Sequence, residues 1–104
     1  MPEERTDEWP SEDATELFEA IALLKTPEEA ERFFRDLCTI GELEAMSHRW
    51  QVARLLDEGL PYQEIARITG ASTATVTRVA QWLKRGENGY RLMIDRTKRR
   101  ARRS

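Results

Sequence analysis

The stretch that decides the fold is residues 62–83, which read Tyr-Gln-Glu-Ile-Ala-Arg-Ile-Thr-Gly-Ala-Ser-Thr-Ala-Thr-Val-Thr-Arg-Val-Ala-Gln-Trp-Leu. The apolar spacing predicts a short helix with Ile65 as its anchor, and a second helix that begins near Thr73 with Ser72 as its N-cap. Gly70 can adopt the positive φ that a tight turn between the two helices requires. The pattern is typical of a helix-turn-helix.

The second helix of this motif, which spans about residues 62–85, separates into two surfaces. Its apolar side chains Val76, Val79, Ala80 and Leu83 fall on one side and should be buried. The other side is short, polar and basic, as expected of a helix that enters the major groove of DNA. We predict base contacts from Thr73, Ala74, Thr75, Thr77, Arg78 and Gln81, and phosphate contacts from Gln63, Ser72, Lys84 and Arg85.

A helix-turn-helix also occurs as a plain packing unit, so the pattern alone leaves that alternative open. The run Ser-Thr-Ala-Thr-Val-Thr at residues 72–77 is rich in β-branched side chains and has poor helix propensity. A surface helix selected for stability alone would not have this composition. The conflict between local propensity and predicted fold favours a functional surface.

The charge is unevenly distributed along the chain. The 104 residues carry a net charge of −2, and 35% of them are charged. Residues 1–44 hold fourteen acidic against four basic side chains, a net of −10, whereas residues 45–104 hold five against thirteen, a net of +8. This asymmetry indicates that one half interacts with nucleic acid or a membrane, or that the chain has a charged tail.

Three amphipathic helices are predicted before the motif. Residues 14–24 and 30–37 place apolar side chains at the spacing of one helical face, and Thr26 with Glu29 forms a capping-box pattern between them. A third helix should run from about Gly41 to Asp57 with a broad apolar arc. No stretch alternates apolar and polar residues as strands do, so the predicted fold class is all-α.

The two ends of the chain differ in composition from its centre. Residues 1–10 are interpreted as a mobile acidic arm with Trp9 as its candidate anchor. Residues 11–95 are predicted to form one helical domain, and residues 96–104 a disordered basic tail. Such a tail either serves as a solubilising end or contacts phosphates without sequence preference.

Several classes of protein are not expected. No apolar run approaches the ~18 residues of a membrane-spanning helix, and the N-terminus lacks the pattern of a signal peptide. The single cysteine, Cys38, and the single histidine, His48, cannot form an intrachain disulfide or a Cys/His metal cluster. We interpret Cys38 as a small buried side chain and His48 as a surface or packing residue. No catalytic constellation or cofactor motif is present, so we predict a cytoplasmic protein that is not an enzyme.

The run from Gly70 to Arg78, Gly-Ala-Ser-Thr-Ala-Thr-Val-Thr-Arg, closely resembles the recognition region of the tryptophan repressor superfamily. With Leu-Cys-Thr at residues 37–39 and Gly-Glu-Asn-Gly-Tyr at residues 86–90, the chain is similar to the YerC/YecD group of TrpR-related DNA-binding proteins over about residues 14–95. The resemblance implies an intertwined helical homodimer whose two helix-turn-helix units bind two half-sites on double-stranded DNA.

The same resemblance suggests a candidate ligand pocket. Arg78 matches the arginine beneath the corepressor, Thr39 matches a threonine near the pocket, and Arg49 is a candidate for a second ligand arginine. The residue after the arginine is glycine in the repressor, where it leaves room for the indole, whereas here it is Val79. We therefore expect no L-tryptophan corepressor, and predict either ligand-independent DNA binding or an effector of another kind.

Together these features predict a sequence-specific transcriptional regulator, most simply a repressor, that acts as a homodimer. The alternative from another class is a protein-interaction module whose basic half docks an acidic partner. The sequence does not distinguish repression from activation, and it does not give the operator, because Ser and Thr have no single preferred base.

Overall fold

The computed structural model describes residues 9–103 of the chain, and these residues form six helices and no strand. The all-α prediction is therefore confirmed for this part of the chain. The chain divides into two compact units between Thr39 and Ile40, where the sequence analysis expected one domain over residues 11–95. Most of the acidic arm predicted for residues 1–10 lies outside the described residues.

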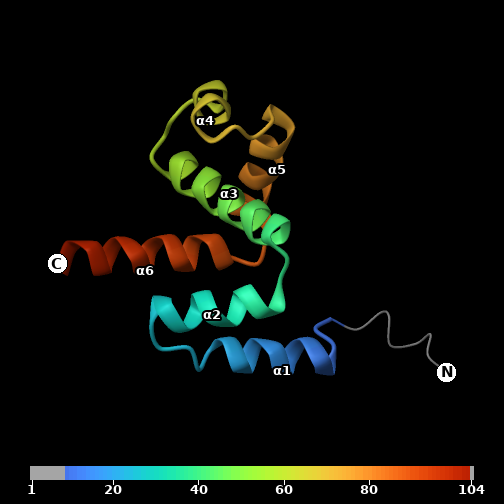
Figure 1. The fold of residues 1–104 in the computed structure, drawn as a ribbon. Helices are drawn as coiled ribbons and strands as arrows, with labels where there is room; N and C mark the ends of the chain where they lie inside the picture. Colours follow the sequence, from blue (N-terminus) through green and yellow to red (C-terminus); the bar gives the residue numbers. More distant parts are fainter. Residues whose placement is uncertain (1–8, 104) are drawn as a thin grey trace. The chain divides into compact units, whose positions relative to one another are not determined.

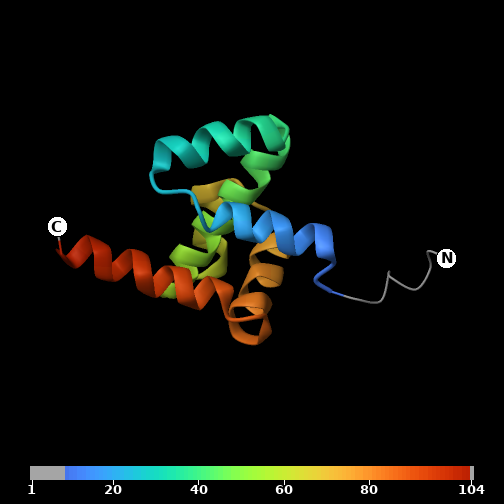
Figure 2. The same ribbon diagram turned by 90° about the horizontal axis from the view of Figure 1, so that it is seen from below.

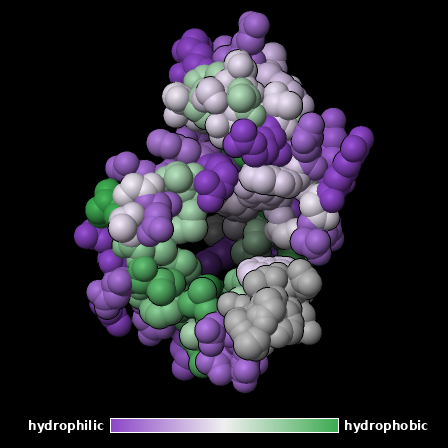
Figure 3. All heavy atoms as spheres, turned by 90° about the vertical axis from the view of Figure 1, so that its right-hand side faces the viewer, coloured by the Kyte–Doolittle hydropathy of each residue, from purple (hydrophilic) through white to green (hydrophobic). Residues whose placement is uncertain are grey.

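The first unit contains two amphipathic helices, α1 (Glu12–Ile21) and α2 (Pro27–Leu37), and neither buries a single residue. Figure 3 shows apolar side chains open at the surface at the level of these two helices. Trp9, the candidate anchor, meets the ring of Phe18 edge-on at 6.1 Å between centroids. Two helices with apolar stripes and no buried side chain do not make a core of their own.

The start of α2 follows the predicted capping pattern with one difference. Thr26 is the N-cap, and its hydroxyl accepts the N–H of Glu29 at 3.1 Å, while Pro27 occupies the first helical position. A complete capping box would return the Glu29 carboxylate to the N–H of Thr26. The carboxylate instead accepts the N–H of Lys25 at 2.9 Å, so it binds the residue before the cap.

The second unit is built on its longest helix, which contacts the other three helices of the unit (Figure 1). Its core is a single cluster of aliphatic side chains contributed by all four helices. The positive φ of Gly59, +90°, ends the long helix as its sequence predicts. The four helices are α3 (Ile40–Asp57), α4 (Tyr62–Thr69), α5 (Thr73–Arg85) and α6 (Gly89–Arg103). The core residues are Val52, Ala53, Ile65, Val76, Val79 and Ile94.

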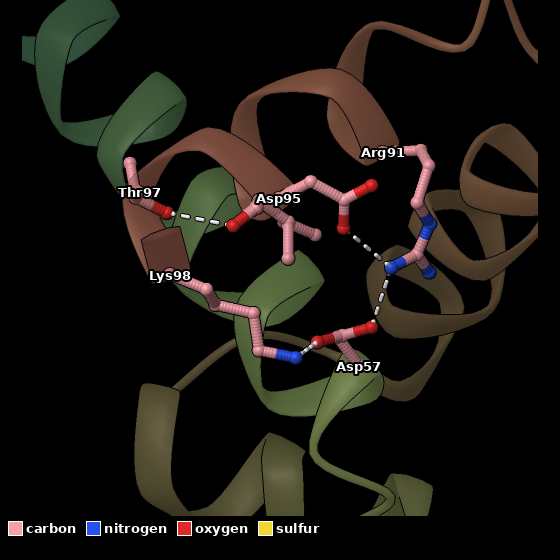
Figure 4. A network of polar contacts seen from close by, with 6 residues as sticks. Asp57, Arg91, Asp95, Thr97 and Lys98 are labelled. Atoms are coloured by element: carbon pink, nitrogen blue, oxygen red, sulfur yellow. Dashed lines mark hydrogen bonds and ion pairs between the residues drawn. The ribbon is translucent and has the colours of Figure 1, made fainter. Parts of the chain in front are cut away.

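Helix α6 corrects the prediction of a disordered tail, because residues 96–103 continue this helix. Ile94 is buried against the core, and Asp57 at the end of α3 binds two cations of α6. The carboxylate of Asp57 lies 2.7 Å from Arg91 Nη1 and 2.7 Å from Lys98 Nζ (Figure 4). Since Arg91 and Lys98 are seven residues apart, they lie on the same side of the helix. Asp57 therefore attaches α6 to the end of α3, although the composition of residues 96–103 alone predicts a tail.

Candidate nucleic-acid interface

The turn between α4 and α5 is held by local contacts. Gly70 takes φ +79° and ψ 0°, the left-handed conformation, and its N–H donates to the carbonyl of Ala66. Thr69 is nearly buried, and its hydroxyl donates to the carbonyl of Ile65 at 2.8 Å and accepts the N–H of Ala71 at 3.1 Å. The sequence analysis missed this role of Thr69. A threonine four residues after a buried helical residue is the signal that could have indicated it.

Helix α5 begins at Thr73 with Ser72 as its N-cap, as predicted. The Ser72 hydroxyl accepts the N–H of Thr75 at 3.1 Å and donates to the Thr75 hydroxyl at the same distance. The first turn of α5 contains no acidic side chain, and its last turn carries Lys84 and Arg85. The helix dipole places a partial positive charge at the N-terminus, which here is left unneutralised and open to an anion.

The two predicted surfaces of α5 are present in the structure. Val76 and Val79 are fully buried, Ala80 is 4% exposed and Leu83 is half-buried. Most of the predicted DNA-contacting side chains are exposed, whereas Thr75 is half-buried and tied to the cap. The exposed ones are Gln63, Ser72, Thr73, Ala74, Thr77, Arg78, Gln81, Lys84 and Arg85. We call those of them that lie on α5 the α5 polar surface: Thr73, Ala74, Thr77, Arg78, Gln81, Lys84 and Arg85.

An ion pair on α4 affects the net charge of the candidate interface. Glu64 and Arg67 form an ion pair one turn apart, which was not anticipated from the sequence. The hydrogen bond from Arg67 lowers the pKa of the Glu64 carboxyl, and the same bond raises the pKa of Arg67. Because the two charges compensate each other, α4 adds little net charge to the candidate interface. Its positive charge comes from α5 instead.

Two hollows of the second unit lie apart from the arginines of the candidate ligand pocket. One hollow of about 670 Å³ is bordered by Trp50, Trp82 and Tyr90 among others, and another of about 280 Å³ lies between α3 and α6. Neither of these two has Arg49 or Arg78 in its lining. Arg49 is half-buried on α3, and Arg78 is exposed on α5.

The candidate ligand pocket also involves Val79 and Thr39. Val79, which the sequence resemblance aligns with the repressor's glycine, is fully buried in the core cluster and lines neither hollow. Thr39 is the last residue of the first unit, whereas Arg49 and Arg78 belong to the second. The pocket of Thr39, Arg49 and Arg78 stays a prediction.

The potential metal ligands within residues 9–103 do not gather into a site. No group of three or more His, Cys, Asp or Glu side chains there is placed to hold a metal ion. Cys38 is half-buried with a free thiol, and His48 is exposed. Across the same described segment, no helix combines the length and apolar character needed to span a bilayer.

Comparisons with known proteins agree on one family. The model of the Trp repressor protein family matches residues 12–98. The chain is 45% identical to the protein YerC of Bacillus subtilis over 92 residues, which cover 88% of each chain. It is 39% identical over 70 residues to a Trp operon repressor homolog of Chlamydia caviae, covering 66% of this chain and 69% of that protein.

A solved structure gives the same result for the fold. A TrpR-like protein from Eubacterium eligens superposes with a TM-score of 0.81 at 43% sequence identity, covering 86% of this chain and 92% of that one. The family match begins at the first residue of α1 and ends within α6. It therefore includes the whole of α4 and α5, with the α5 polar surface.

Proposed function

We propose that this chain, which belongs to the Trp repressor family of DNA-binding transcriptional regulators, binds a specific operator as a homodimer and represses transcription. The observation that carries the proposal is the α5 polar surface, which is exposed along a helix whose other side packs Val76 and Val79 into the core. The fold is the all-helical, TrpR-like fold that the sequence resemblance predicted. The family consists of regulators rather than enzymes, and we assign no catalytic role to the chain.

In the proposed complex, α4 and α5 act as the helix-turn-helix, and α5 enters the major groove with its N-terminal turns first. Small side chains at Thr73, Ala74 and Thr77 let the helix approach the base edges closely. Arg78, which is exposed, would bind a guanine through its guanidinium, the commonest specific contact of this side chain. At the base of the motif, Lys84 and Arg85 would hold phosphates.

The homodimer is supported by the first unit. Neither α1 nor α2 buries a residue, although both carry an apolar stripe. Phe18 is 49% exposed, Leu23 74% and Leu37 46%. A second copy would cover this apolar surface, and its two-fold symmetry would present two α5 helices to two half-sites. Sedimentation that returns one chain per particle at micromolar concentration would contradict this part of the proposal.

We further propose that DNA binding does not depend on L-tryptophan. The proposal is supported by Val79, which the resemblance aligns with the repressor's glycine and whose side chain is fully buried, so it occupies space that a glycine would leave open. Calorimetric titration with L-tryptophan should release no heat of binding. Micromolar affinity in that titration would overturn this part of the proposal. The same DNA-binding role, together with the single thiol of Cys38, supports a cytoplasmic location.

The deciding experiment is selection of bound sequences from a pool of random duplex DNA. A palindromic consensus is expected, because a two-fold dimer binds symmetric half-sites. Failure to enrich any sequence would count against sequence-specific regulation.

One substitution distinguishes DNA binding from the alternative, in which an acidic protein docks on the basic half. Thr77→Glu places a carboxylate on the α5 polar surface and should abolish binding to the selected operator through repulsion of phosphates. Thr15→Glu, at an exposed position on α1, is the matched control and should bind as the wild type does. Binding of DNA by the Thr77→Glu protein at wild-type affinity would favour the docking alternative.

A further inference from the structure

A second basic surface lies on α6, and the contacts of Asp57 determine which side chains form it. Asp57 engages Arg91 and Lys98 on the side of α6 that faces α3. The single acidic residue of the helix, Asp95, lies 3.6 Å from Arg91 and is paired with it. Three arginines at successive turns are exposed and make no ion pair within the described part of the chain. We call them the α6 arginine patch: Arg96, Arg99 and Arg102.

The α6 arginine patch is apart from the α5 polar surface. Within the second unit, α6 lies on the other side of α3 from α4, and it runs away from the N-terminus of α5 (Figures 1 and 2). A DNA duplex held by the first turns of α5 therefore lies on the far side of α3 from the patch. The patch does not simply extend the surface that reads the operator.

We propose that the α6 arginine patch binds the phosphate backbone of a second DNA segment, so that one protein molecule joins two stretches of DNA. The inference rests on the proposed function of α5, which brings the protein to DNA. Guanidinium groups match phosphate oxygens through paired hydrogen bonds. The row contains no side chain suited to reading base edges, so this contact should be independent of sequence.

Two features make the patch more than a mobile charged tail. Its helix is attached to α3 by Asp57 and by the buried side chain of Ile94, so the arginines are held on one rigid element. Residues three apart on a helix are neighbours, so the three guanidinium groups lie in one row. Asp95 is engaged by Arg91, so the patch is not neutralised from within its own helix.

The test measures capture of one duplex by another. The duplex obtained by selection is immobilised, saturated with protein, and exposed to a dye-labelled duplex of random sequence. Wild-type protein should retain the labelled duplex, and the triple change Arg96→Gln, Arg99→Gln, Arg102→Gln should lose it while keeping operator affinity. The slope of log affinity for the labelled duplex against log salt should flatten by about 1 for each arginine removed. The matched control is Arg32→Gln with Arg35→Gln, two exposed arginines of α2.

The outcomes separate the proposal from its rivals. Thr77→Glu should abolish operator binding. When the Thr77→Glu protein is immobilised in place of the operator, it should still retain the labelled random duplex. Failure of the α5 assignment is therefore distinguishable from failure of the patch. Capture by the triple variant at the wild-type level would overturn the proposal. A parallel fall in operator affinity would also overturn it, by assigning the patch to the same duplex. A fall in dimerisation instead would assign the patch to the acidic helices of a second copy.

Discussion

Removal of the Asp57 charge tests how α6 is attached to the second unit. The Asp57→Asn change keeps the shape of the side chain but removes both ion pairs. Each pair is 2.7 Å long, and the side chain of Asp57 is 11% exposed against 39% for Arg91 and 55% for Lys98. Exposed pairs contribute about 0.2–1 kcal/mol, and hydrogen bonds to charged groups about 1.5–3 kcal/mol. Because both cations are more than a third exposed, solvent screening discounts each pair to about 0.5–1 kcal/mol.

The expected loss in the free energy of unfolding is therefore about 1–2 kcal/mol for the two pairs together. Urea denaturation followed by circular dichroism measures it, and the midpoint should fall while the slope stays constant. The matched control is Glu58→Gln, which removes the exposed neighbouring carboxylate and should change stability by less than about 0.5 kcal/mol. Equal losses for the two variants would refute the role assigned to Asp57.

The same attachment has a defined pH dependence. The hydrogen bond from Lys98, followed by that from Arg91, holds the pKa of Asp57 below its usual value, against the opposing effect of burial. Since the folded-state pKa is the lower one, the stabilisation is fully present above the unfolded-state value of about 3.9 and is lost as the pH falls through the folded-state value. The stability difference between the wild type and Asp57→Asn should thus be constant from pH 7 to pH 5 and shrink below pH 4. A difference that persists unchanged at lower pH would contradict the assignment.

Three other substitutions, one of them with a matched control, follow from the structure. Ser72→Ala removes the N-cap of α5 and should cost about 1 kcal/mol in urea denaturation, with no change in the denaturant slope. Gly86→Ala places a Cβ 2.6 Å from the carbonyl oxygen of Trp82 and should cost about 1–3 kcal/mol, whereas Gly41→Ala, with open space around it, should not destabilise. Thr73→Glu should raise the free energy of unfolding by about 0.3–1 kcal/mol and yet abolish operator binding in a gel-shift assay.

The sequence predicted α4 and α5 well because their signals are local. Ser72 as N-cap and Gly70 as the left-handed turn residue depend only on their immediate neighbours. The α6 helix was missed for the opposite reason. Its attachment depends on Asp57, which lies 34 and 41 residues before its two partners. A run of arginines without this distant carboxylate has the composition of a disordered end.

The predicted DNA-contacting residues divide in a similar way. A helical wheel separates buried from exposed positions correctly for most of α5, because Val76 and Val79 determine which side faces the core. It cannot show that Thr75 is tied to the cap by its hydroxyl. It also gives no information on the pocket of Arg49 and Thr39, since that depends on how elements distant in the sequence pack together.

The acidic residues in the first turns of the helices bear on the proposal that the N-terminus of α5 binds DNA. The first turn of α1 carries two acidic residues, that of α2 also carries two, and α3 and α4 carry one each. Such residues stabilise a helix by about 0.3–1 kcal/mol each through the dipole. Helices α5 and α6 have none. Of these two, α5 has the β-branched composition that gives poor helix propensity, so it would gain from an acidic residue in its first turn. An acidic residue there would repel phosphate, so Thr73→Glu should have opposite effects on folding and on DNA binding. If Thr73→Glu raised stability and left operator affinity intact, the open N-terminus of α5 would have no role in DNA binding.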